Sequence, residues 1–123
     1  MARSMGNDST PESFLPLHRD TFQILVSLAD GDCHGYAIMQ QIAERTGDAR
    51  AITPSTLYSS IRRLLDSGLI KELHERPNRE QDDPRRRYYR LTSLGRRVAE
   101  LEARRLDRLL HDARNGGLLP RRS

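Results

Sequence analysis

The chain has 123 residues, of which 36% are hydrophobic, 31% charged and 5% aromatic, with a formal net charge of +4 and no Trp. This length and composition predict one domain with a small core built mainly from Leu and Ile. No apolar run reaches the roughly 20 residues that span a bilayer, and the polar N-terminus lacks a signal-peptide core, so we expect a cytoplasmic protein that does not enter the membrane. The single cysteine, Cys33, excludes an internal disulfide and a multi-cysteine zinc site.

The basic residues are concentrated in the middle of the chain. Residues 53–99 contain eleven Arg and Lys against six Asp and Glu, whereas residues 1–52 contain four against seven. A GC-rich genome would account for the excess of Arg over Lys, but it would not account for this uneven placement. The distribution therefore indicates a local face that binds anions.

The first third of the chain predicts a tail and two helices. Residues 1–16 are polar and are expected to form a loose, disordered tail. Apolar residues with a helical period begin at Leu17, and the Asp-Gly-Asp sequence at residues 30–32 ends this first helix. A second helix is expected from about His34 to Gly47.

The third predicted helix is the most informative. Thr53 supplies a capping oxygen and Pro54 suits the first helical position, so a helix is expected from there to about Ser67. Its apolar stripe is Leu57, Ile61, Leu64 and Leu65. The opposite arc carries hydroxyls, arginines, an acid and, at its edges, Thr56 and a tyrosine: Ser55, Thr56, Tyr58, Ser59, Arg62, Arg63 and Asp66.

A hairpin and a last helix complete the pattern. Two β-prone segments, 69–75 and 85–91, flank a polar loop. A helix over residues 93–114 follows, starting at Thr92 or Ser93, and residues 115–123 are expected to be a frayed tail. The apolar residues of this helix cover an arc of about 180°, which is wider than a helix needs to pack against a single neighbouring surface. Glu102 and Arg105 interrupt the arc and can pair at the i, i+3 spacing.

This order predicts a mainly α fold with a β-hairpin wing (α+β). Three helices and a hairpin over residues 17–92 form a winged helix-turn-helix, and residues 93–114 form a C-terminal dimerisation helix. In such a unit the third helix enters the major groove of double-stranded DNA. The planar fork of Arg can bond to guanine O6 and N7 together, and hydroxyls suit phosphates.

Three sequence blocks, in order, resemble the PadR family of transcriptional regulators. They are HGYAI at residues 34–38, TPSTLY at 53–58 continuing into RLLDSGLI at 63–70, and RYYRLTSLG at 87–95. The resemblance covers about residues 17–112 and is closest to the small subfamily with one short C-terminal helix. Ser55 is a departure, because the family more often has Gly there.

The resemblance implies a homodimer, joined largely through the C-terminal helix, that represses transcription from a pseudo-palindromic operator. It also implies that a ligand can release the DNA. The small subfamily can hold a flat aromatic effector between the dimer-interface helices, often on a Trp, and this chain has no Trp.

These arguments give two sets of candidate residues. The expected DNA contacts are Tyr36, Thr53, Ser55, Thr56, Tyr58, Ser59, Arg62, Arg63, Arg79, Arg85, Arg86 and Arg87. The expected dimer interface is Leu101, Leu106, Leu109, Leu110 and Ala113.

Alternatives stay open for several of these residues. Tyr36 and Tyr58 can pack at the core edge or bond to phosphate, and the arginines at 85–87 can contact DNA or balance the acids of the hairpin loop. Arg62 and Arg63 can be ordinary solvated residues.

Three rival functions also remain. The first is a winged-helix module for protein–protein interaction without sequence-specific DNA binding. The second is an RNA-binding module, which would need Tyr88 and Tyr89 as stacking platforms. The third is an enzyme, but no catalytic constellation is recognisable, no cofactor is expected, and the adjacent Cys33 and His34 are too few for a metal site.

Overall fold

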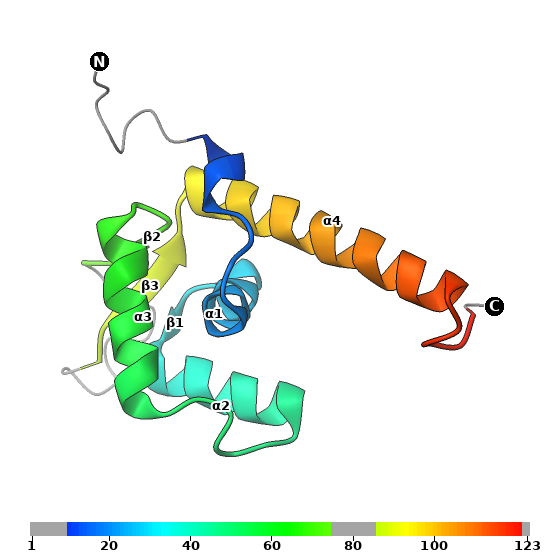
Figure 1. The fold of residues 1–123 in the computed structure, drawn as a ribbon. Helices are drawn as coiled ribbons and strands as arrows, with labels where there is room; N and C mark the ends of the chain where they lie inside the picture. The colour runs from blue at the N-terminus through cyan, green and yellow to red at the C-terminus, as the bar shows by residue number, and fades with distance from the viewer. Residues whose placement is uncertain (1–9, 75–85, 122–123) are drawn as a thin grey trace.

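A computed structural model describes residues 10–74 and 86–121. Figure 1 shows helices packed beside a small antiparallel sheet, with the last helix projecting from the body. The elements are η2 (Pro11–Phe14), α1 (Arg19–Ala29), β1 (Cys33–His34), α2 (Gly35–Thr46), α3 (Pro54–Asp66), β2 (Ile70–Glu72), β3 (Tyr88–Leu91) and α4 (Ser93–Asn115). This is the α+β winged-helix fold that the sequence predicts.

Side-chain caps fix where the helices begin. Thr53 Oγ1 accepts a hydrogen bond from the Thr56 amide at 3.2 Å, and Thr92 Oγ1 accepts one from the Gly95 amide at 3.0 Å. Each bond satisfies an amide that the first helical turn leaves without a partner. The predicted starts of α3 and α4 are therefore confirmed.

The sheet has a third strand that the sequence analysis did not predict. The strand order is β1-β3-β2, with Cys33 opposite Tyr89 in one antiparallel pair and Glu72 opposite Tyr89 in the other. A two-residue strand is too short to show an alternating pattern, so β1 is detectable only through its pairing with β3.

Residues 10–16 also differ from the expected loose tail. Pro11–Phe14 forms a 3-10 helix that packs against α4. The Leu17 amide, just after it, donates a hydrogen bond to the buried Glu102 carboxylate at 3.2 Å. A tertiary contact holds this segment in place, and its polar composition gave no sign of that contact.

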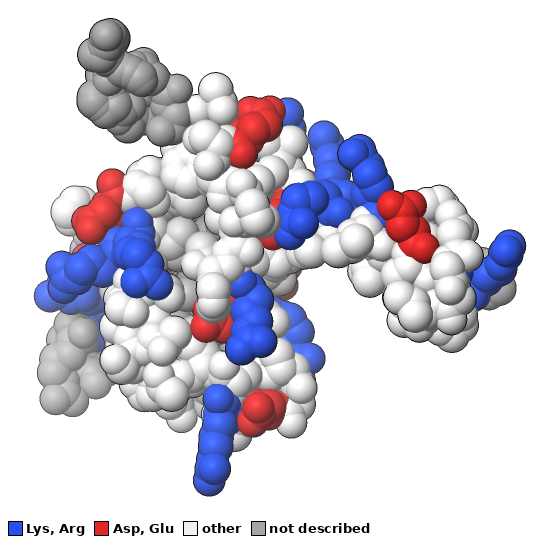
Figure 2. All heavy atoms as spheres, in the orientation of Figure 1, with Lys and Arg blue, Asp and Glu red and all other residues white. Residues whose placement is uncertain are grey.

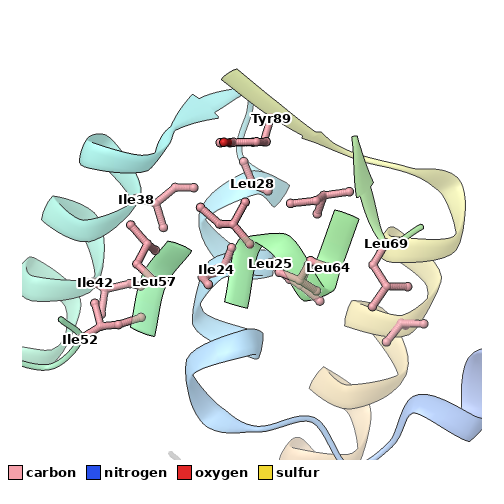
Figure 3. Close-up of a cluster of buried hydrophobic side chains, with 13 residues drawn as sticks. Ile24, Leu25, Leu28, Ile38, Ile42, Ile52, Leu57, Leu64, Leu69 and Tyr89 are labelled. Atoms are coloured by element: carbon pink, nitrogen blue, oxygen red, sulfur yellow. The ribbon is translucent and has the colours of Figure 1, made fainter. Parts of the chain in front are cut away.

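The core lies between α1, α2, α3, the sheet and the first turns of α4, which contribute the fully buried Val98 (Figure 3). Ile24 and Leu25 from α1, Ile38 from α2 and Leu57 from α3 are fully buried, and Tyr89 from β3 lies against the same cluster. No helix within residues 10–74 and 86–121 combines the length and apolar character needed to cross a membrane.

The first and second halves of α4 have different surroundings. Near its start, a Cβ atom on Gly95 would lie 1.8 Å from the Leu69 carbonyl oxygen, so only glycine allows this close approach to the domain. Burial along α4 ends at Glu102, and the following turns stand clear of the body (Figures 1 and 2). Glu102 accepts hydrogen bonds from Arg105 at 2.7 and 3.0 Å, as the i, i+3 spacing predicts.

Candidate nucleic-acid interface

An open groove of about 720 Å³ lies where α2 begins, between α3 and the sheet. The candidates that line it are Tyr36, Tyr58, Arg62, Arg86 and Arg87. They come from the start of α2, the outer side of α3 and the residues that lead into β3. In Figure 2 basic side chains lie over α3, next to acidic ones. The fold thus brings aromatic hydroxyls and arginines from three distant parts of the sequence to one surface.

At the start of α2, His34 orders the residues that face the groove. Its Nδ1 accepts a hydrogen bond from the Ala37 amide at 3.1 Å, which caps the helix. Its ring stacks on Tyr36, with ring centroids 6.4 Å apart, and meets the edge of Tyr88 at 5.1 Å. Tyr36 is held by this stacking but remains 54% exposed, so its hydroxyl is accessible to a ligand.

Tyr58 reaches from α3 to the same helix start. A Cβ atom on Gly35 would lie 2.7 Å from the Tyr58 hydroxyl oxygen, so the tyrosine occupies the space that a side chain at Gly35 would take. Tyr58 is 51% exposed, and its hydroxyl lies beside the N-terminus of α2. A helix N-terminus presents amide groups and partial positive charge, which favour an anion such as phosphate.

The neighbouring arginines of α3 lie in different places. Arg62 lines the groove, whereas Arg63 donates a hydrogen bond to the buried Ser60 at 3.3 Å and lines a shallow depression near η2. Both side chains are exposed. Arg62 is therefore the arginine of α3 that the fold groups with the two tyrosines.

The hydroxyl candidates of α3 are exposed or half-buried, and three of them have local partners. Thr53 caps the helix and its hydroxyl also donates to that of Thr56 at 3.1 Å, while Ser59 donates to the Thr56 carbonyl at 3.1 Å. Ser55 lies exposed in the first turn. Their local bonds order this end of α3.

The arginines in and next to β3 pair with different acids. Arg90 pairs with Asp32 through two hydrogen bonds of 3.0 and 2.8 Å, and these bonds lower the pKa of Asp32. Arg87 comes just before β3 and pairs instead with Glu72, with 3.4 Å between the guanidinium nitrogen and the carboxylate oxygen. Arg86 and Arg87 line the groove, while Arg79 and Arg85 lie outside the described residues.

The structure also shows the surroundings of the β3 tyrosines and of Cys33. Tyr88 and Tyr89 are 8% and 5% exposed, and burial raises the pKa of Tyr89, so neither ring offers a free stacking platform for RNA bases. Burial also raises the pKa of the Cys33 thiol, which contacts the Ser27 carbonyl and Gln41. Among residues 10–74 and 86–121, no three potential metal ligands lie together.

The fold and this groove define a winged-helix protein of the kind that binds nucleic acid. The model of the PadR-like family of transcriptional regulators matches residues 24–101, and the chain belongs to this family. The resemblance seen in the sequence is thereby confirmed.

Solved structures agree with this assignment, and a curated protein is also similar in sequence. A PadR family transcription regulator from Clostridium difficile is 28% identical, with a TM-score of 0.67 over 83% of this chain and 100% of that one. A transcriptional regulator from Clostridium thermocellum is 30% identical, with a TM-score of 0.63 over 79% of this chain and 87% of that one. A 37.1 kDa protein in transposon TN4556 of Streptomyces fradiae is 36% identical over 70% of this chain, which spans only 22% of that protein.

Sequence reasoning did not place His34, Gly35 and Glu72 among the residues of the groove. His34 was expected only to begin a helix, Gly35 was noted only as part of a motif, and Glu72 was read as part of a strand. The order His-Gly-Tyr at a helix start gave a signal for the first two, because a capping side chain and a glycine precede an aromatic residue. No local signal marks Glu72, whose position depends on the pairing of β2 with β3.

Proposed function

We propose that this protein is a homodimeric transcriptional repressor that binds a pseudo-palindromic operator through α3 and the groove beside it. The observation that carries the proposal is the grouping of Tyr36, Tyr58, Arg62 and Arg87 around one groove. Family membership supports DNA as the ligand.

Each part of the groove suits a different part of DNA. The exposed side of α3 fits the major groove, where Arg62 can bond to guanine O6 and N7. Tyr36 and Tyr58 lie at the N-terminus of α2 and suit a backbone phosphate. Arg86 and Arg87 extend this cationic surface along the neighbouring backbone.

The second half of α4 supports the homodimer. Leu109 is 57% exposed and Leu110 is 42% exposed, while Leu101, Leu106 and Ala113 are half-buried. A second copy of the same helix related by two-fold symmetry would cover these residues. Pairing of this kind would place two α3 helices about 34 Å apart, the spacing of inverted half-sites one helical turn apart.

Release by an effector is part of the same proposal. A flat aromatic molecule would bind between the paired α4 helices, where leucine side chains supply the apolar walls. In the absence of Trp, packing against aliphatic side chains would replace ring stacking.

Fluorescence anisotropy of a labelled DNA duplex over a range of salt concentrations tests DNA binding. The logarithm of the association constant is expected to fall linearly with the logarithm of salt concentration. Replacing Arg86 and Arg87 with Ala should weaken binding to all sequences alike and flatten this slope by about one unit for each lost phosphate contact.

The matched control carries Arg97→Ala with Arg104→Ala, which removes two exposed α4 arginines outside the groove. It should leave the slope close to that of the wild type. A wild-type protein that does not bind duplex DNA would favour the protein–protein interaction module, and an unchanged slope for the groove variant would assign Arg86 and Arg87 to the acids of the hairpin.

A further inference from the structure

Glu72 places a carboxylate in the groove where an anionic ligand is expected. Its Oε1 lies 3.4 Å from Nη1 of Arg87, and both residues line the groove. Glu72 is opposite Tyr89 in the β2–β3 ladder, and Arg87 lies two residues before Tyr89, just ahead of β3, so the end of the ladder brings Glu72 and Arg87 close together. The pairing register therefore brings the acid and the arginine together.

This ion pair is accessible to a competing anion. The Arg87 side chain is 69% exposed and that of Glu72 is 38% exposed. By contrast, Glu102, which pairs with Arg105 on α4, is nearly fully buried. Ion pairs exposed to water are weak, so a phosphate group can displace the Glu72 carboxylate.

The displacement changes how much Arg87 contributes to DNA binding. An arginine that contacts a DNA phosphate adds to binding because it releases a cation condensed on the duplex. While Glu72 holds Arg87, part of that gain is offset by breaking the pair, and the freed carboxylate remains near the phosphates. The Glu72 carboxylate and the phosphates are both negatively charged and repel each other.

We propose that Glu72 competes with DNA phosphate for Arg87 and thereby weakens the part of DNA binding that does not depend on sequence. The inference rests on the proposed function of the groove. Because every duplex carries the same phosphates, Glu72 acts on all sequences alike and leaves base discrimination by Arg62 unchanged.

The test compares Glu72→Gln with a matched control, Glu100→Gln. Glu100 pairs with Arg97 on α4 at 3.7 Å, outside the groove, so both substitutions remove one carboxylate from an exposed ion pair and change the net charge equally. Each protein is titrated with a duplex of mixed sequence at several salt concentrations, and circular dichroism checks that each is folded.

Glu72→Gln should bind about 2- to 5-fold more tightly than the wild type at low salt, as expected for removal of an exposed ion pair. Its salt slope should be steeper by up to about 0.9, the value for one additional phosphate contact. Glu100→Gln should bind like the wild type. In an Arg87→Ala background the gain from Glu72→Gln should be clearly smaller, because only the repulsion between the carboxylate and the phosphates is then removed.

Two results would overturn the inference while leaving DNA binding intact. Equal affinity of Glu72→Gln and Glu100→Gln would show that the carboxylate has no special effect in the groove. A gain of undiminished size in the Arg87→Ala background would show that Glu72 does not act through Arg87. A lack of duplex binding by the wild type and every variant would instead reject the proposed function itself, and the inference with it.

Discussion

The helices α3 and α4 both carry an apolar stripe at helical spacing, but only α3 buries its stripe within its own domain. Leu57, Ile61 and Leu64 of α3 are all buried. On α4 burial ends at Glu102, and Leu109 and Leu110 beyond it remain exposed. The outer side of α3 is thus left with hydroxyls and arginines for a polar ligand, whereas α4 has apolar surface that no part of residues 10–74 and 86–121 covers.

The two helices differ in how much of the apolar stripe is buried because α4 is much longer than α3. At about 1.5 Å per residue, the 23 residues of α4 extend about 34 Å, while the 13 residues of α3 extend about 20 Å, within the dimension of a small domain. Among the described residues the elements that pack against α4 are mainly α1, η2 and β3, and all three are shorter than α4. Beyond them the helix projects from the body, as Figure 1 shows.

The largest expected effect comes from changing the uncovered half of α4. Leu106→Glu with Leu110→Glu should give a folded monomer, because charges on this surface would prevent two copies from packing. Its affinity for an operator should fall by about 100-fold or more, since each half-site must then be bound separately. Light scattering, circular dichroism and anisotropy measure assembly, folding and affinity.

The control for this variant is Leu118→Glu, which changes an 80% exposed leucine beyond the end of α4. It should remain dimeric with full affinity. A double variant that stays dimeric and binds DNA as the wild type does would contradict the account of α4.

The next effect concerns the outer side of α3. Arg62→Ala should lose about 1–3 kcal/mol on the operator and relax the preference at one base-pair position, because the proposed function has this side chain bond to a guanine. Anisotropy with operators substituted at each position measures this loss. Equal loss on every sequence would assign Arg62 to a phosphate instead, and Arg97→Ala, on α4, is the control that should have little effect.

A smaller effect is expected from Gly35, which does not itself carry a functional group. Gly35→Ala would push the Tyr58 hydroxyl away from the N-terminus of α2, since the new methyl group would lie 2.7 Å from it. The loss in DNA affinity should resemble that of Tyr58→Phe, about 0.5–1.5 kcal/mol for one hydrogen bond. Thermal stability should be kept, because an exposed tyrosine can move.

A double-mutant cycle makes the test of Gly35 specific. With Tyr58→Phe already present, Gly35→Ala should add little further loss, because the hydroxyl that it displaces is gone. Wild-type affinity of Gly35→Ala, or losses that simply add, would show that Gly35 does not act by positioning Tyr58.

The last prediction concerns stability at Glu102, where burial on α4 ends, and little effect on DNA binding is expected. Hydrogen bonds from Arg105 lower the pKa of Glu102 from its ordinary value of 4.5. The stability that it contributes is therefore fully present above that value and is lost as the pH falls through the lowered pKa. Glu102→Gln should be less stable than the wild type at pH 7, and the difference in melting temperature should shrink towards pH 3. A difference that does not change with pH would rule out the carboxylate as its source.

The elements that local chemistry determines could be predicted from the sequence. The stripe of α3, the caps Thr53 and Thr92 and the pairing of Glu102 with Arg105 depend on residues within one or two helical turns, and all four are observed. These features, with the basic residues of the hairpin, were sufficient to predict the winged-helix fold and five of the residues that line the groove.

The features that could not be predicted depend on contacts between distant residues. Strand β1 exists through its pairing with β3, and η2 is positioned by α4. The placement of Tyr58 against Gly35 joins residues 23 positions apart, and the pairing of Glu72 with Arg87 depends on the register of a hairpin. No periodicity in the sequence encodes these distances.

Selection of bound sequences from a random duplex library tests the central claim most directly, since it asks whether α3 reads DNA as part of a two-fold dimer. The expected result is enrichment of an inverted repeat with half-sites centred about one helical turn apart, about 34 Å. The same selection with Arg62→Ala should lose the preference at one symmetry-related position in each half-site. Enrichment of no sequence, or of a single half-site without its inverted copy, would contradict the account.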